Sequence, residues 1–116
     1  MVKESILKVK SYAFSVKVVY CYKDLAKKRE FVLSKQLLRS GTAVGALVRE
    51  AEFGQSKADF RSKLSIALKE ANETDYWLSL LKDTEYIEES KYRELDMHCK
   101  ELIRILVASV KTSRGE

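Results

Sequence analysis

Proline is missing from all 116 residues, and glycine occurs only four times. These two residues most often interrupt helices and form turns. A chain that has few of them and is rich in Leu, Ala, Lys, Glu and Ser favours long helices over a β fold with many turns. The composition therefore predicts an all-α protein.

Cysteine is scarce, and long apolar runs are absent. Cys21 and Cys99 lie far apart and form neither a CxxC motif nor the dense pattern of a secreted disulfide scaffold. The N-terminal segment lacks the apolar block of a signal peptide, and the longest apolar run, 18–22, is too short to span a membrane. We therefore expect a cytoplasmic protein that has no membrane partner.

The residue patterns of common active sites are also absent. The sequence contains no P-loop, no nucleophile elbow and no H-E-x-x-H zinc motif. His98 is the single histidine, whereas di-iron sites in four-helix bundles use two histidines with several glutamates. Cys99 lies on an apolar helical stripe, which indicates a core residue and not a nucleophile. We therefore predict a non-enzyme with no catalytic residues, no metal, no other cofactor and no small-molecule substrate.

Hydrophobic periodicity divides the chain into four helical segments. Apolar positions recur at alternating steps of four and three, most regularly from Phe60 to Leu81. Ser34, the Ser56–Asp59 pair and Glu88 are predicted to cap the starts of the last three helices. Short connections favour an antiparallel up-down-up-down four-helix bundle. A single domain is predicted over residues 1–116, with helices at about 3–28, 34–53, 56–83 and 88–111.

The second segment contains the small residues Ser40, Gly41, Ala43 and Gly45. A glycine inside a helix costs about 1 kcal/mol relative to alanine, so two of them need a compensating gain. We expect that the missing side chains allow another helix to approach closely.

The first segment has more apolar surface than one bundle core requires. Ile6, Val9, Ala13, Val16 and Tyr20 have the spacing of a bundle seam, and a second apolar stripe lies beside them. Because large exposed apolar patches are uncommon on lone domains, we expect the second stripe to contact another subunit or a partner. The alternative is a helix sunk deep in its own core. The candidate interface residues on this stripe and on the third segment are Leu7, Phe14, Val18, Leu25 and Trp77.

Positive charge is concentrated in the first part of the chain. Residues 1–40 hold ten Lys and Arg against three Asp and Glu, a net +7, while residues 41–116 hold twelve against fourteen. Such a field attracts RNA, DNA or acidic surfaces, although a solvated helical surface is the alternative. Tyrosines among these lysines either stack on bases or pack in the core. The candidate nucleic-acid-binding residues are Lys10, Lys17, Lys27, Lys28, Arg29, Lys35 and Arg39.

Several stretches follow a pattern found in a known protein family. They are Gln36–Ser40, the run GTAVGALVREA at 41–51, the run LSIALKEA at 64–71, and Tyr86–Glu89 with Tyr92. In these stretches the chain resembles the four helix bundle proteins, also called 23S ribosomal RNA intervening-sequence proteins. The resemblance implies a left-handed antiparallel four-helix bundle that assembles as a homo-oligomer, a pentameric ring. It also implies nucleic-acid binding in related proteins and no established enzymatic activity.

Two functional hypotheses follow. The first is a basic homo-oligomer that binds RNA or DNA through the phosphate backbone. Because an oligomer repeats its basic patch, weak contacts add together and the affinity falls steeply with salt. The second is a protein-interaction scaffold or accessory subunit that docks a partner through the apolar face of its first helix.

Overall fold

The computed structural model describes the backbone of residues 2–116 and the side chains of residues 6–116. Within this range it contains four helices and no strand: α1 (Val2–Lys27), α2 (Leu33–Glu52), α3 (Lys57–Asp83) and α4 (Glu89–Ser113). The predicted all-α, four-helix class is confirmed.

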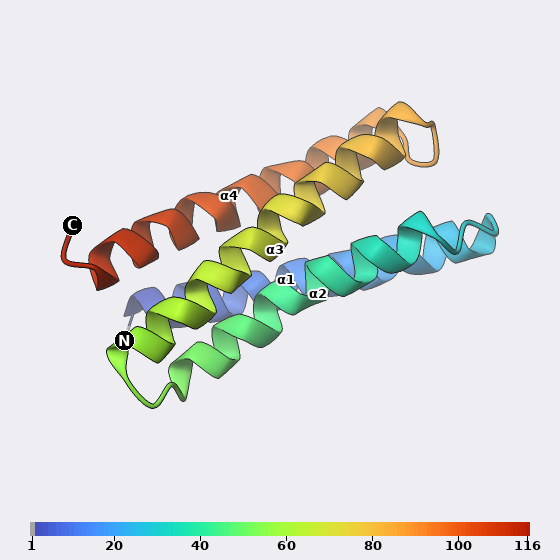
Figure 1. Ribbon diagram of the computed structural model, residues 1–116. Helices are drawn as coiled ribbons and strands as arrows, with labels where there is room; N and C mark the ends of the chain where they lie inside the picture. Colours follow the sequence, from blue (N-terminus) through green and yellow to red (C-terminus); the bar gives the residue numbers. More distant parts are fainter. Residues whose placement is uncertain (1) are drawn as a thin grey trace.

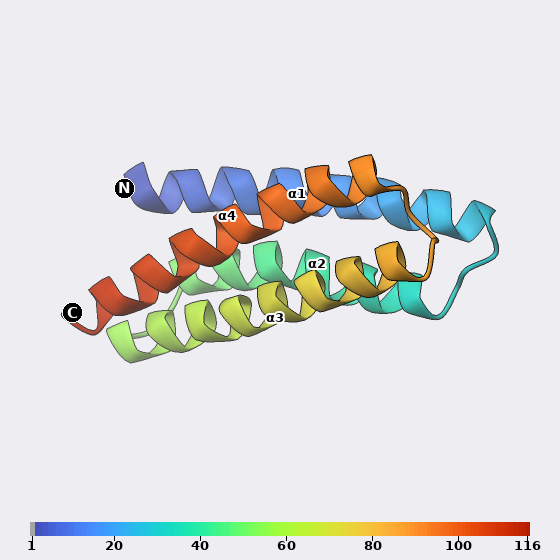
Figure 2. The ribbon, with the colours of Figure 1, turned by 90° about the horizontal axis from the view of Figure 1, so that it is seen from above.

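The helices form an elongated bundle that measures 44 × 21 × 20 Å. Each helix packs against the next one in the chain, α1 also packs against α4, and consecutive helices run in opposite directions (Figure 1). The contact between α1 and α4 is the smallest of the four helix–helix contacts. Both chain termini lie at the same end of the bundle (Figure 2). The left-handed twist stays a prediction.

The start of α3 has the cap that the sequence predicts. The Ser56 hydroxyl accepts a hydrogen bond from the Asp59 N–H at 3.0 Å, and the Asp59 carboxylate accepts one from the Gln55 N–H at 3.1 Å. Both N–H groups lack a partner inside the helix, so this reciprocal arrangement satisfies them. The predicted capping pair is confirmed.

The predicted cap of α2 is wrong. Ser34 lies inside the first turn, where it is buried and its hydroxyl donates back to the Glu30 carbonyl oxygen at 2.6 Å. The Glu30 carboxylate caps the helix instead, because it accepts hydrogen bonds from the N–H groups of Val32, Leu33 and Ser34 at 3.3, 3.1 and 2.7 Å. Glu30, which precedes α2, therefore caps this helix in place of Ser34.

The core uses a different face of α1 from the predicted seam. The seam residues lie on the outside of the bundle, where Val9 is 66% exposed, Tyr20 62% and Ile6 43%. Ala13 and Val16 are exposed on the same face. The buried face of α1 is the neighbouring stripe, which consists of Leu7, Ser11, Phe14, Val18, Cys21 and Leu25.

Because the neighbouring stripe of α1 is the buried one, the prediction is wrong for four of the five candidate interface residues. Leu7, Phe14, Val18 and Leu25 are each at most 4% exposed, so they belong to the core of the single chain and have no surface to offer another subunit. Trp77 remains half-buried on α3, where its ring packs edge-on against Tyr76 and its indole N–H donates to the Glu73 carboxylate at 2.9 Å. The surplus apolar surface exists, but it is the outer face of α1.

Small residues bring α1 and α2 close together, as the sequence predicts. A Cβ atom at Gly41 would lie 2.8 Å from Cγ2 of Val18, and one at Gly45 would lie 3.2 Å from the Ser15 hydroxyl. The first distance leaves no room for a side chain unless α1 moves, whereas the second needs only a small shift of the Ser15 hydroxyl and of the nearby Ser11 carbonyl. The close packing of α1 against α2 therefore offsets the poor helix propensity of the two glycines.

Candidate functional site

The turn between α1 and α2 is a basic segment, and backbone hydrogen bonds define its conformation. Arg29 follows the end of α1 with φ +67°, in the left-handed region. The Glu30 N–H donates to the Leu25 carbonyl at 3.0 Å, and the Arg29 N–H donates to the Ala26 carbonyl at 2.9 Å. This is the Schellman ending of a helix, formed here without glycine. It places Lys27, Lys28 and Arg29 together at the bundle end.

Glu30 fixes the other half of this turn. Its side chain is only 8% exposed and lies beneath the first N–H groups of α2. Burial alone would raise the pKa of Glu30, but the N–H groups of Ser34, Leu33 and Val32 outweigh it and hold the pKa below its usual range. The carboxylate is therefore charged, and the turn between the two helices is firmly tied. No sequence motif pointed to Glu30, because it lies two residues before the N-cap position, Val32, and not at that position.

The tip of the turn exposes two apolar side chains. Phe31 is 46% exposed and Val32 is 73% exposed. Lys27, Lys28 and Arg29 precede them, and Lys35 follows on the exposed side of the first turn of α2. An exposed aromatic ring with cations on both sides of it in the sequence is the composition expected of a surface that contacts nucleotides.

Ion pairs divide the predicted nucleic-acid-binding residues into two groups. Lys10 pairs with Glu101 at 3.0 Å and Lys17 with Glu94 at 3.0 Å, which ties α1 to α4. Arg39 on α2 pairs with both Glu70 and Glu73 on α3. The predicted phosphate contacts of these three residues compete with existing carboxylate contacts.

The remaining candidates cluster at the α1–α2 turn. Lys28 donates to the carbonyl oxygen of Tyr86 at 2.9 Å, which links this turn to the α3–α4 turn at the same end (Figure 1). Among the residues that the structure describes, Lys27, Arg29 and Lys35 have no carboxylate within ion-pair distance. We refer to Lys27, Arg29 and Lys35 as the free cations of the turn.

The neighbouring α3–α4 turn has the opposite charge. Asp83, Glu85, Glu88 and Glu89 are all exposed there. The end of the bundle is therefore divided into a basic half, formed by the α1–α2 turn, and an acidic half beside it. Any polyanion that binds this end must stay on the basic half.

Two tyrosines of α1 are on the surface and not in the core. Tyr12 is 58% exposed with the Arg49 guanidinium 5.5 Å from its ring centre, and Tyr20 is 62% exposed with the Lys23 ammonium 5.4 Å from its ring centre. The packing alternative is therefore wrong for these two rings, which extend the apolar outer face of α1 with cations at its edges.

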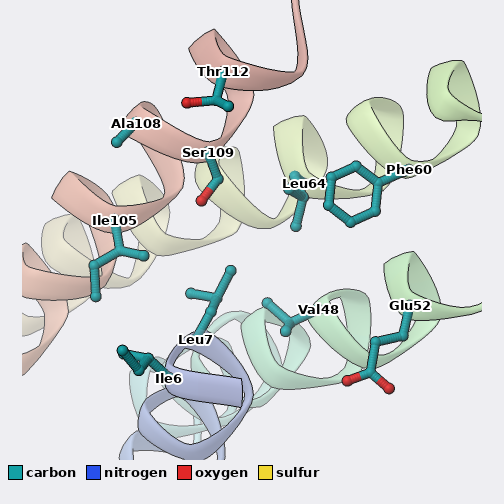
Figure 3. A pocket seen from close by; sticks show the side chains of 10 residues that line it. All are labelled: Ile6, Leu7, Val48, Glu52, Phe60, Leu64, Ile105, Ala108, Ser109 and Thr112. Carbon is teal, nitrogen blue, oxygen red and sulfur yellow. The ribbon is translucent and has the colours of Figure 1, made fainter. Parts of the chain in front are cut away.

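A cavity of about 410 Å³ opens between α1 and α4 at the other end of the bundle, near the chain termini (Figure 3). Glu52, Ser109 and Thr112 are its polar lining residues, and Glu52 lies 3.4 Å from the Lys8 ammonium. The cavity can hold an apolar group, but its walls present no nucleophile with a general base. The apolar walls are formed by Ile6, Leu7, Val48, Phe60, Leu64 and Ile105.

Neither cysteine has an activated thiol. Cys21 and Cys99 are both free and buried. Burial raises the pKa of Cys21 to about 11 and that of Cys99 to about 12, and the Cys99 thiol donates to the Ala71 carbonyl at 3.3 Å. Both therefore act as small core residues, as predicted for Cys99. Within residues 6–116, no three His, Cys, Asp and Glu side chains form a group suited to a metal ion.

Two partly buried carboxyl groups, those of Asp75 and Asp96, lie between α3 and α4. Oδ1 of Asp75 and Oδ1 of Asp96 are both inaccessible and have no donor, while the Lys100 ammonium lies 2.6 Å from Oδ2 of Asp96 and 3.6 Å from Oδ1 of Asp75. Burial, then the hydrogen bond and the charge of Asp96, raise the pKa of Asp75 to about 6. Burial would also raise the pKa of Asp96, but the hydrogen bond from Asp75 and then Lys100 outweigh it and lower that pKa. Asp75 therefore takes up a proton more readily than Asp96 does.

Replacing Asp75 by Asn is expected to stabilise the protein at pH 7. A raised pKa in the folded state means that the stabilising contribution of the Asp75 proton is complete below about pH 4 and is lost as the pH rises through about 6. Two pKa units correspond to roughly 3 kcal/mol, and because the Asp75 side chain is 29% exposed we expect a gain of about 1 to 2 kcal/mol.

Urea unfolding at pH 4.5 to 7.5 measures this effect. The difference between Asp75→Asn and the parent protein should grow across this range, whereas Asp83→Asn, whose carboxylate is 69% exposed, should show no such trend. A variant that is less stable than the parent at pH 7 contradicts the raised pKa of Asp75.

None of the helices in residues 2–116 combines the length and the apolar character needed to cross a membrane.

Comparison with known proteins identifies the family. The family described as 23S rRNA-intervening sequence protein matches residues 3–108. A crystal structure from Bacteroides thetaiotaomicron, described as a protein with unknown function from the S23 ribosomal protein family, is 51% identical in sequence, with a TM-score of 0.92 over 94% of this chain and 98% of that one. Comparison with curated proteins finds no match. The chain belongs to the 23S rRNA-intervening sequence protein family.

Proposed function

We propose that the protein is a non-enzymatic homo-oligomer that binds RNA or DNA through its phosphate backbone at the α1–α2 turn. The observation that carries this proposal is the set of free cations on that turn, Lys27, Arg29 and Lys35. Charges that already face carboxylates gain little from a phosphate, whereas these three lose no existing ion pair. The family name, which refers to ribosomal RNA, agrees with a nucleic-acid partner.

The proposed oligomer forms through the outer face of α1. Ile6, Val9, Ala13, Val16 and Tyr20 form a continuous exposed stripe over four turns of the helix. An apolar patch of this extent on a bundle surface marks an interaction site. A second copy of the chain is the proposed occupant, in a pentameric ring as the family resemblance implies.

Assembly strengthens the proposed binding of polyanions. Each protomer contributes the same three free cations, so a ring presents them several times to one strand. Linked sites raise the apparent affinity without any new contact in the single site. Each phosphate contact also releases counterions, which makes the affinity fall with added salt.

Fluorescence anisotropy with a labelled 20-nucleotide RNA tests the phosphate contacts. For single strands, three contacts per protomer give a slope of about −2 in log affinity against log salt, so affinity should fall at least about tenfold between 50 and 200 mM salt. A triple variant with Gln at Lys27, Arg29 and Lys35 should bind more weakly and show a shallower slope.

The matched control removes the same charge elsewhere. Lys57, Lys69 and Arg104 are exposed and have no ion pair among the described residues, and a triple Gln variant at these positions has the same net charge as the turn variant. If both triple variants lose the same affinity for RNA, the net charge of the protein and not the position of the cations determines binding. Absence of binding at 50 mM salt by the parent protein would refute nucleic-acid binding itself.

The alternative function is a scaffold or accessory subunit that docks a different protein. The outer face of α1 favours it as much as it favours self-association, because Val9 and Tyr20 are both more than 60% exposed. Solution mass by light scattering separates the two. A single-chain mass at high concentration would favour a different partner, and a multiple of 13.3 kDa would favour the homo-oligomer.

A further inference from the structure

We infer that Phe31 is a stacking platform for an unpaired base, so that the α1–α2 turn binds single-stranded in preference to double-stranded nucleic acid. This inference rests on the proposed function and names its substrate class. The turn combines an exposed aromatic ring, cations on both sides of it in the sequence, and a backbone that is tied in place.

Hydrogen bonds fix the backbone on both sides of Phe31. Glu30, directly before Phe31, accepts hydrogen bonds from the N–H groups of Val32, Leu33 and Ser34. Arg29 on the other side is fixed by its hydrogen bond to Ala26. Phe31 thus follows a helix ending and precedes a capped helix start, and 46% of its surface remains open to solvent. A backbone that is fixed before binding reduces the conformational entropy lost when a base stacks on the ring.

The free cations supply phosphate contacts around the ring. Lys27 precedes Phe31 by four residues, Arg29 by two, and Lys35 follows it by four. None of them has a carboxylate partner within the part of the chain that the structure describes. Surfaces that bind single strands combine a base-stacking aromatic with cations that follow the backbone. In a duplex the bases are already paired and stacked, so Phe31 has no exposed base face to contact.

The acidic half of the bundle end favours a narrow ligand. Lys28 joins the α1–α2 turn to Tyr86, so the carboxylates of Asp83, Glu85, Glu88 and Glu89 lie beside the basic half. The whole bundle measures only 21 × 20 Å across its long axis. An anionic membrane surface would cover the whole end and meet these four carboxylates, whereas a single strand can remain on the basic half.

Phe31→Leu tests the stacking, since it keeps an apolar side chain but removes the ring. Anisotropy at 50 mM salt should show about a tenfold loss of affinity for a labelled single-stranded RNA and little change for a hairpin duplex of the same length. The matched control is Phe53→Leu, which removes an 82% exposed ring from the α2–α3 turn at the opposite end of the bundle (Figure 1). That control should bind both RNAs as the parent does.

Phe31→Trp gives a second, direct readout. It should retain affinity, and its indole fluorescence, measured as the difference from the parent with its single Trp77, should be quenched as the strand is added. Unchanged single-strand affinity in Phe31→Leu, or an equal loss for single strand and duplex, would overturn the stacking inference. Salt-dependent binding by the parent in that case would leave the proposed function intact. Co-sedimentation with phosphatidylglycerol vesicles that depends on Phe31, without RNA binding, would indicate a membrane contact and overturn both.

Discussion

Phe14→Asp is expected to prevent folding, whereas Val9→Asp is expected to leave the bundle folded and to reduce its self-association. Phe14 is 1% exposed in the core. Truncating a buried Phe to Ala already costs about 3 to 5 kcal/mol, and an unpaired buried carboxylate adds several more. That sum approaches the whole stability of a small domain, which is about 5 to 15 kcal/mol. Circular dichroism at 222 nm should show the loss of helix in Phe14→Asp.

The Val9→Asp variant is expected to remain folded, because Val9 is 66% exposed on the outer face of α1. A carboxylate at this position stays in water, so the helix signal should be unchanged while the mass from light scattering falls toward that of one chain. Val32→Asp is the matched control, since Val32 is 73% exposed but lies outside α1, and its mass should equal that of the parent. An assembled Val9→Asp variant would place the subunit contact on another face.

The second large effect is expected from Gly41→Ala. The added Cβ would lie 2.8 and 2.9 Å from the two methyl groups of Val18, which is fully buried and branched at Cβ, so it cannot rotate away. Overpacking of this kind costs about 1 to 3 kcal/mol, even after the gain of about 1 kcal/mol in helix propensity. Urea unfolding should therefore show a less stable protein despite a better helix former.

A double variant identifies the cause. Val18→Ala alone leaves a cavity and destabilises, but combined with Gly41→Ala it supplies the space that the new methyl group needs. The two changes should therefore be less harmful together than their sum, by at least about 1 kcal/mol. Strict additivity would show that the Gly41–Val18 contact does not limit the packing of α1 on α2. Gly45→Ala should cost less, because its nearest neighbour is the Ser15 hydroxyl, which can rotate.

The four helices were predictable because their hydrophobic periodicity and one capping pair agree. The orientation of α1 was not predicted, because two neighbouring apolar stripes have the same spacing and Ser11 interrupts the one that is buried. One signal does distinguish them. The exposed stripe continues into Lys23 and Lys27, whereas the buried stripe continues through Cys21 to Leu25. Hydrophobic periodicity identifies the two apolar faces of α1. The residues at the C-terminal end of each stripe indicate which of the two faces is buried.

The candidate site was predicted only in outline. The charge excess pointed to the first 40 residues and to Lys27, Arg29 and Lys35 among others. Sequence could not separate these from Lys10 and Lys17, since their partners Glu101 and Glu94 lie on α4 and meet them only in the folded bundle. Phe31 was unmarked because its significance depends on exposure, and exposure depends on the Glu30 cap beneath the turn.

The two chain termini lie at one end of the bundle, and the α1–α2 turn lies at the other end of its 44 Å length (Figure 2). A fusion partner, an affinity tag or a surface tether attached through either terminus would therefore sit remote from Phe31. Immobilised protein should present its basic turn outward and unobstructed, which is the orientation that the proposed strand binding requires.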